Sequence, residues 1–402
     1  MKKIALFARD PKNWVSCREM NWATYLKHYD NLGNLVWTYG IFKALQTPTN
    51  DLTLIDPIHP EISVDEINER FDHIVFSFAN LIDPQKANRI RFLADIISRL
   101  KIPLTVCSVG VQSPDFGDYE FLKPIKQEAQ RLFSKCLEHG VCIGTRGDFT
   151  TDCLSQLGFA KHTKTIGCPS FFINGPEFSI SKTQRDEKNI KVAFNDTDAT
   201  RSEIFEFSKK CQTEKFSYIT QGYPLRGEKD PIVLQLIAQK KLHLFGDFHS
   251  WNAFLKLFDL SISSRIHGTV MALLAGVPSA IITVDARTHE MADFFRIPKV
   301  SLTGLQQQPN ASSLYESLNF NEINTNYSTL LNNYASFLSE NGLNHFLTYP
   351  QDFIKNQLAH SLPPQVKDDH TSSLVEFPKL SGWFMQTPAY RFITQLTAKF
   401  NV

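Results

Sequence analysis

The residues best suited to chemistry form one short block, Ser264-Arg265-Ile266-His267, between a strand-like apolar run and a helix-like run that starts near Gly268. A strand-to-helix turn aims backbone N–H groups and the positive end of the helix at the carboxyl edge of a sheet, where an anion is stabilised. Arg265 can hold a carboxylate or phosphate through two hydrogen bonds, and His267 can donate a proton near neutral pH. We therefore predict an anion-binding site here.

An isolated Arg-x-His triplet could be purely structural, with Arg265 capping a neighbouring element and His267 sitting at a helix start. The surroundings favour a function instead. Ala275-Gly276-Val277-Pro278 ends the helix-like run, and another buried strand-like run follows it. That context places the triplet at the carboxyl edge of a sheet, which is where open α/β sheets bind ligands.

The elements that would position this block are short apolar runs alternating with longer amphipathic stretches. Unalternated apolar runs bounded by helical segments are typical of parallel strands with both faces covered, so the sequence predicts an α/β fold. A polar segment at 174–189 has the composition of a connection and predicts a domain boundary. The predicted units are an N-terminal α/β domain at 1–180, a C-terminal α/β domain at 181–345 and a helical tail at 346–402. The predicted strands are 4–7, 52–55, 73–77, 104–109, 142–145, 165–167, 190–194, 216–219, 242–245, 260–262 and 280–284.

The composition is that of a globular protein with no bias toward nucleic acid. The 402 residues include 42 basic and 41 acidic side chains, a formal net charge of +1, and no long run of one sign. A nucleic-acid partner is not indicated. Seven scattered cysteines suit a reducing compartment, and neither a signal-peptide core nor a membrane-spanning run is expected. We expect a cytoplasmic protein, with an amphipathic segment at 383–400 that docks on the protein or touches the inner face of a membrane.

Several blocks together resemble the polysaccharide pyruvyl transferase family. The most specific is Ser264-Arg265-Ile266-His267-Gly268 with Ala275-Gly276-Val277-Pro278. Asn31-Leu32-Gly33-Asn34 is similar to the family's N-terminal turn, and Gly167-Cys168-Pro169-Ser170 to the segment that closes its first domain. Thr145-Arg146-Gly147-Asp148 resembles its Arg-containing strand end, although Gly147 separates the arginine from the aspartate.

The resemblance implies two Rossmann-like domains facing a cleft, in a GT-B-like arrangement. It also implies transfer of the enolpyruvyl unit of phosphoenolpyruvate to two hydroxyls of a sugar, with release of phosphate and no further cofactor. Arg146 and Arg265, from opposite domains, would hold this donor together with Ile266, Gly268 and the helix start. His267 would protonate the methylene carbon or the departing phosphate.

The acceptor would be a sugar, a glycan or a lipid-linked saccharide. Asp285 or Glu290 could act as the base toward its hydroxyls, and Arg287 could hold the sugar or the phosphate of the donor. The alternative is that Asp285 or Thr288 caps a helix with Glu290 in its first turn, and the sequence leaves both open.

On the opposite wall, Asn31 and Asn34 are candidates for acceptor contact, with the alternative that these residues serve only the turn, and Gln112 is a weaker candidate. Asp196-Thr197-Asp198 matches a pattern that holds a metal in some glycosyltransferases, but it is expected to be a cap or a solvated loop, and no metal is predicted. Two other functions remain open: a GT-B glycosyltransferase that uses a nucleotide-sugar, and a non-catalytic glycan-binding relative.

Overall fold

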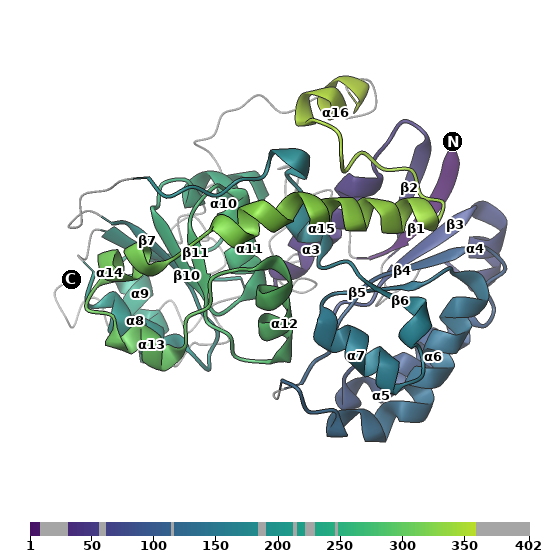
Figure 1. Ribbon diagram of the computed structural model, residues 1–402, viewed down its shortest axis with the longest axis horizontal. Coiled ribbons are helices and arrows are strands. Elements are labelled where there is room, and N and C mark those ends of the chain that lie inside the picture. Colours follow the sequence, from purple (N-terminus) through teal and green to yellow (C-terminus); the bar gives the residue numbers. More distant parts are fainter. Residues whose placement is uncertain are drawn as a thin grey trace, which may run out of the picture.

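The computed structural model describes residues 1–8, 31–55, 62–113, 116–183, 190–211, 215–221, 230–245 and 248–358. These residues form two parallel β-sheets with helices packed against them (Figure 1). The expected α/β class is therefore confirmed, with two Rossmann-like units in a GT-B-like arrangement.

The first sheet has the strand order β2-β1-β3-β4-β5-β6, and all of its described pairings are parallel. The order reverses between β1 and β3, as in doubly wound folds. Its strands are β1 Lys2–Phe7, β2 Asn50–Ile55, β3 His73–Ser77, β4 Leu104–Val109, β5 Ile143–Thr145 and β6 Thr163–Thr165. Its helices are α3 Gly33–Leu45, α4 Val64–Arg70, α5 Ala87–Ile97, α6 Lys126–His139 and α7 Asp148–Gln156.

The second sheet has the order β11-β10-β7-β8-β9, again parallel, and its order reverses between β7 and β10. Its strands are β7 Val192–Asn195, β8 Phe216–Ile219, β9 Leu242–His243, β10 Leu260–Ser263 and β11 Ser279–Ile281. Its helices are α8 Arg201–Ser208, α9 Pro231–Ala238, α10 Phe248–Leu255, α11 Ile266–Leu274, α12 Ala286–Phe295, α13 Leu302–Gln307 and α14 Ala311–Ser317.

Both faces of the first sheet are buried, which is why its strands are apolar without alternation. Along β1, Ile4 and Leu6 pack into the cluster that contains α3, whereas Ala5 and Phe7 pack into the cluster beneath α5 and α6. The predicted strands all form, with small shifts at their ends. The run predicted at 165–167 ends as a strand at Thr165, because Gly167 adopts a positive φ of 77° that turns the chain away.

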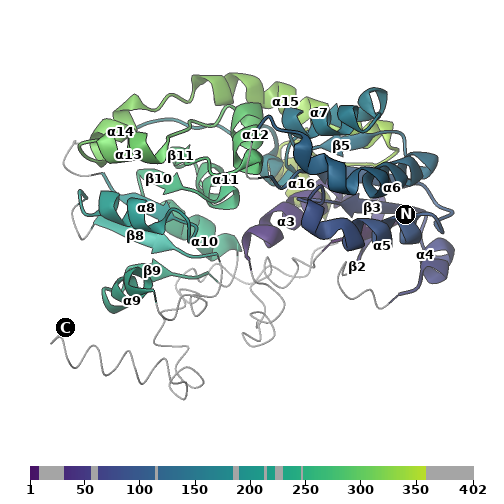
Figure 2. The ribbon, with the colours of Figure 1, turned by 90° about the horizontal axis from the view of Figure 1, so that it is seen from below.

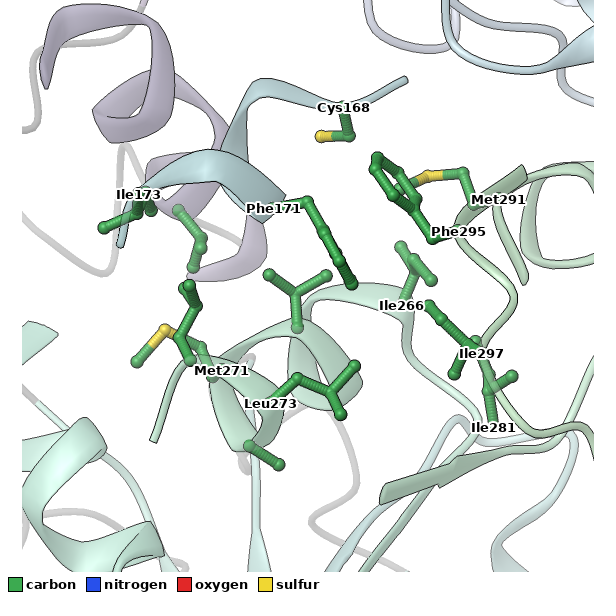
Figure 3. Packing of buried hydrophobic residues seen from close by; sticks show 14 of the residues in the cluster. Cys168, Phe171, Ile173, Ile266, Met271, Leu273, Ile281, Met291, Phe295 and Ile297 are labelled. Carbon is green, nitrogen blue, oxygen red and sulfur yellow. The ribbon is translucent and has the colours of Figure 1, made fainter. Parts of the chain in front are cut away.

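A continuous apolar core joins the two domains. The segment Pro169–Phe172, which follows the first sheet, packs against α11 and α12 of the second domain (Figure 3). Phe171 stacks on Phe295 of α12 with ring centroids 4.0 Å apart. Because this core lies beside the carboxyl edges of both sheets, it fixes how the two edges face each other.

Helix α15, Asn321–Glu340, crosses from the second domain to the first (Figures 1 and 2). Near its C-terminal end, Tyr334 stacks on Phe172, and Lys164 of β6 pairs with Glu340 at 2.9 Å. The chain then contacts the start of the first sheet, since Lys2 Nζ donates to the carbonyl of Gly342 at 2.7 Å.

The segment predicted as a tail contains helix α16, Gln351–Leu358, and residues 359–402 lie outside the described part of the chain, including the amphipathic segment at 383–400. Within the described ranges, every helix is too short or too polar to cross a bilayer.

Candidate active site

The predicted anion-binding block lies at the reversal point of the second sheet. Ser264 and Arg265 follow β10, and Asp196 and Thr197 follow Asn195, the last residue of the neighbouring strand β7. Thr197 N donates to Ser264 Oγ at 2.9 Å, so the two turns are joined directly. Crevices at such reversal points are the usual ligand sites of open α/β sheets.

The turn between β10 and α11 is held by its own hydrogen bonds. Ser263 Oγ accepts from the backbone N of Arg265 at 3.0 Å and donates to its carbonyl at 2.7 Å. Ile266 is buried among the apolar residues of the junction (Figure 3), and a Cβ at Gly268 would collide with Asn195 Oδ1. The Ile266 side chain therefore serves packing, and Gly268 is required by the close approach of Asn195.

Arg265 is held by the β7–α8 loop. Its Nε donates to the carbonyl of Asp196 at 2.6 Å. The carboxylates of Asp196, Asp198 and Asp230 surround Arg201 at 3.5, 2.6 and 2.6 Å. Burial raises the pKa of Asp196 to about 6, against the opposing effect of the two arginines. The Asp-x-Asp pattern thus forms an ion cluster centred on Arg201, and no three His, Cys, Asp or Glu side chains of the described residues are arranged so that they could hold a metal ion.

Arg146 is buried just after the end of β5, and two of its three guanidinium nitrogens donate hydrogen bonds. Its Nη1 donates to Asn80 Oδ1 at 2.7 Å and its Nε to Ser108 Oγ at 3.4 Å. Its Nη2 is buried and has no hydrogen-bond partner among the described residues. Ser108 adopts a left-handed φ of 57° where the register of β4 and β5 shifts, so a strained bulge presents this contact to Arg146.

Arg287 reaches the same place from the second domain. Its Nη2 donates to Asp285 Oδ2 at 3.0 Å, while its buried Nε has no partner in the described part of the chain. Burial lowers the pKa of Arg287, and the nearby charge of Arg146 lowers it further. The sequence predicted that Arg265 pairs with Arg146 across the domains. In the structure, the charge of Arg146 acts on Arg287, whereas Arg265 is held by the β7–α8 loop, where the charge of Arg287 acts on it in turn.

Asp285 is occupied as a helix cap. Its Oδ1 accepts from the backbone N of Thr288 at 2.8 Å, and the Thr288 hydroxyl accepts from the backbone N of Asp285 at 3.1 Å. With Oδ2 on Arg287, both carboxylate oxygens are engaged. The structure therefore places Asp285 as the cap of α12 and the orienting partner of Arg287.

Glu290 is the buried carboxyl of the junction. It accepts from the backbone N of Thr150 at 2.9 Å and from the Thr150 hydroxyl at 2.8 and 2.9 Å, across the domain boundary. A Cβ at Gly147 would come within 2.9 Å of Glu290, so the glycine that separates Arg146 from Asp148 makes room for this carboxyl. Burial raises the pKa of Glu290 to about 7, although Thr150 and Arg146 oppose the shift.

His267 faces the N-terminus of α3 from the first turn of α11, and the two helices lie side by side (Figure 2). Its Nε2 is 3.8 Å from Cys168 Sγ, and its Nδ1 would be 2.9 Å from a Cβ at Gly33. Burial and the charges of Arg146 and Arg287 hold the pKa of His267 well below its usual value. The imidazole is therefore neutral near pH 7.

The three predicted acceptor residues lie on the first-domain side of the junction. Asn31 Oδ1 accepts from Gly33 N at 2.9 Å in the turn that precedes α3. Asn34 is half-buried in the first turn of α3. Gln112 Oε1 accepts from Asn80 Nδ2 at 3.1 Å, so it belongs to the network around Arg146.

A family model described as polysaccharide pyruvyl transferase matches residues 13–286, which is well over half of the chain. The chain belongs to this family. As a member it is a transferase, and the matched range contains Arg146, Arg265 and His267. No curated protein matches the chain.

Among solved structures, the transferase is similar to UDP-GlcNAc 2-epimerase from Methanocaldococcus jannaschii, at 12% identity and a TM-score of 0.45 over 82% of this chain and 99% of that one. It is also similar to S. aureus MnaA, solved with UDP, at 12% identity and a TM-score of 0.44 over 90% of this chain and 98% of that one. For Anabaena Alr3699/HepE, solved with UDP and glucose, the identity is 13% and the TM-score 0.43 over 90% of this chain and 99% of that one. Likenesses this distant carry nothing about the substrate of the transferase.

Sequence reasoning missed the residues that support the transferase's charged groups: Asn80, Ser108 and Thr150. Each is a small polar residue that has no distinctive neighbour along the chain. A signal was available only for Thr150, which lies four residues after Arg146 and thus one turn into the following helix. The other two reach Arg146 only through the pairing of β3, β4 and β5.

Proposed function

We propose that the protein transfers the enolpyruvyl unit of phosphoenolpyruvate to two hydroxyls of one sugar, forming a cyclic pyruvate ketal and releasing phosphate. The observation that carries the proposal is a pair of buried donors, Arg146 Nη2 and Arg287 Nε, that have no hydrogen-bond partner among the described residues and belong to side chains from opposite domains whose charges act on each other. Asp285 pairs with Arg287, whose side chain is 25% exposed, but the guanidinium of Arg146 still faces a second cation, which is unfavourable unless an anion joins the two. A doubly anionic small molecule would relieve that repulsion.

Phosphoenolpyruvate meets this requirement with a carboxylate and a phosphate. Arg146 and Arg287 would hold one anionic group by charge-assisted hydrogen bonds. Arg265 lies near enough to Arg287 for the two charges to affect one another, and would hold the other group together with the first turn of α11. The donor would thus bridge the two domains.

Glu290 and His267 are suited to the proton transfers. A carboxyl whose pKa lies near 7 is protonated often enough to act as an acid at neutral pH, and an anionic donor beside it favours the protonated form further. A neutral imidazole can accept a proton. We therefore assign the acid role to Glu290 and the base role to His267, which reverses the roles expected from the sequence.

The reaction then balances in two steps. His267 takes the proton of the first hydroxyl as its oxygen bonds to C2 of the donor, while Glu290 gives its proton to C3, which becomes a methyl group. The second hydroxyl then replaces phosphate at C2. Its proton goes to the Glu290 carboxylate, and the His267 imidazolium protonates the departing phosphate, so both residues return to their starting states.

The proposed acceptor is a sugar of a surface polysaccharide or of its soluble or lipid-linked precursor. Asn34 and Gln112 supply amide groups on the first-domain side, where hydroxyl groups could be held. Gln112 is the better placed of the two, because Asn80 connects it to Arg146.

Thermal stabilisation by phosphoenolpyruvate tests the donor. A ligand that binds only the folded chain raises its melting temperature, and we expect this rise for the wild type but not for Arg287→Met. Arg131→Met is the matched control, because Arg131 pairs with Asp95 at the surface with half of its side chain exposed. Phosphate release from phosphoenolpyruvate with glycan acceptors then tests turnover. Stabilisation by a UDP-hexose in place of phosphoenolpyruvate would overturn the proposal in favour of a glycosyltransferase.

A further inference from the structure

An aromatic cluster bridges the two domains beside Glu290. Phe116 lies in the connection after β4, and its ring stacks on His289 of α12 with centroids 5.2 Å apart and planes 21° apart. The same ring packs against Phe149 of α7 at 5.1 Å. Phe116 therefore touches one ring from each domain.

The side chain of Phe116 is more exposed than expected for a residue that only holds two domains together. Its side chain is 48% exposed, whereas Phe149 beneath it is only 5% exposed. An aromatic ring that served only to hold the domains together would gain most by full burial. Half of its apolar surface is instead left open to water on a rigid base of two other rings.

The cluster is adjacent in sequence to the proposed reacting groups in both of the segments that form it. His289 precedes Glu290 on α12, and Phe149 precedes Thr150, whose hydroxyl and backbone N hold Glu290. Asp148, next to Phe149, is exposed, and its charge lies close enough to raise the pKa of Glu290. An open apolar face and an exposed carboxylate thus stand together at the edge of the predicted site.

We propose that Phe116, supported by His289 and Phe149, is the platform on which a pyranose ring of the acceptor glycan packs. This inference rests on the proposed function. A pyranose has an apolar face of C–H groups and a rim of hydroxyls, so it matches a flat aromatic surface with a carboxylate at its side. Because the platform takes Phe116 and Phe149 from the first domain and His289 from the second, the acceptor subsite is complete only where the domains meet.

Saturation-transfer NMR on the full chain tests the platform, with the methyl glycosides of glucose, galactose, mannose and N-acetylglucosamine as probes. We expect at least one glycoside to bind the wild type and to bind Phe116→Ala roughly tenfold more weakly. Phe116→Trp should retain binding, because it keeps an aromatic face. Phe92→Ala is the matched control, since Phe92 is 42% exposed on α5, where it packs on Arg89.

Equal binding of the glycosides to wild type and Phe116→Ala, or no binding to the wild type, would overturn the platform. Melting temperatures of the same samples with and without phosphoenolpyruvate separate this result from the donor proposal. If phosphoenolpyruvate stabilises the wild type but no glycoside binds to it, the donor site is supported and the platform is overturned. If glycosides bind the wild type through Phe116 but phosphoenolpyruvate does not stabilise it, the platform is supported and the donor proposal is overturned.

Discussion

Replacing Glu290 by glutamine is expected to stabilise the fold at alkaline pH and to abolish turnover. Glutamine has nearly the same shape and can keep both contacts with Thr150, by accepting from its backbone N and donating to its hydroxyl oxygen. What it removes is the charge. The effect on stability and the effect on activity should therefore have opposite signs.

The size of the effect follows from the pKa of Glu290, which is about 7 in the folded chain against 4.5 for the ordinary carboxyl. Because the folded value is raised, the folded chain binds a proton more tightly than the unfolded chain does. The stability from this group is fully present below pH 4.5 and is lost as the pH rises to about 7, a loss of about 3 kcal/mol. Glutamine incurs no such loss.

Urea unfolding at pH 5 and pH 8, followed by tryptophan fluorescence, measures this difference. Trp37 is buried in the first domain and Trp251 in the second, so the fluorescence follows the unfolding of both domains. We expect the gain of Glu290→Gln over wild type to grow from a small value at pH 5 to about 3 kcal/mol at pH 8. Glu120→Gln, at an exposed ion pair with Lys123, should show no such growth. A gain that is equal at the two pH values would refute the assignment of a raised pKa to Glu290.

Three other substitutions test the same site. Thr150→Val removes hydroxyl contacts that favour the Glu290 carboxylate, so the alkaline limb of the turnover profile should move up by about one pH unit, with Thr151→Val as the control. Gly147→Ala places a methyl group against Glu290, and calorimetry should show a loss of about 1–3 kcal/mol; an unchanged melting temperature would contradict this steric reasoning. His267→Ala should keep the stabilisation by phosphoenolpyruvate but lose phosphate release, and a variant with normal turnover would remove His267 from the mechanism.

The elements and the anion-binding turn could be predicted because their signals are local. The strand runs are apolar throughout since both sheet faces are covered, and this is visible in any short stretch such as β1 or β4. The turn from β10 to α11 follows from a strand, a pair of serines and a run of small residues. Arg265 and His267 were therefore found at the carboxyl edge without knowledge of the whole fold.

The partners and protonation states of the site depended on contacts between distant segments. The charges of Arg146 and Arg287 act on each other because α12 of one domain packs against α7, the helix that follows β5, of the other, and no local pattern in either segment indicates this. The pKa of Glu290 rises because Thr150 and Gly147 enclose it, and that of His267 falls through burial beside two arginines. The sequence determined which chemical groups were available and at which edge of each sheet they lie. The tertiary structure decided which charges become neighbours and how much water they lose, because desolvation and Coulomb interactions depend on distance in space and not on distance along the chain.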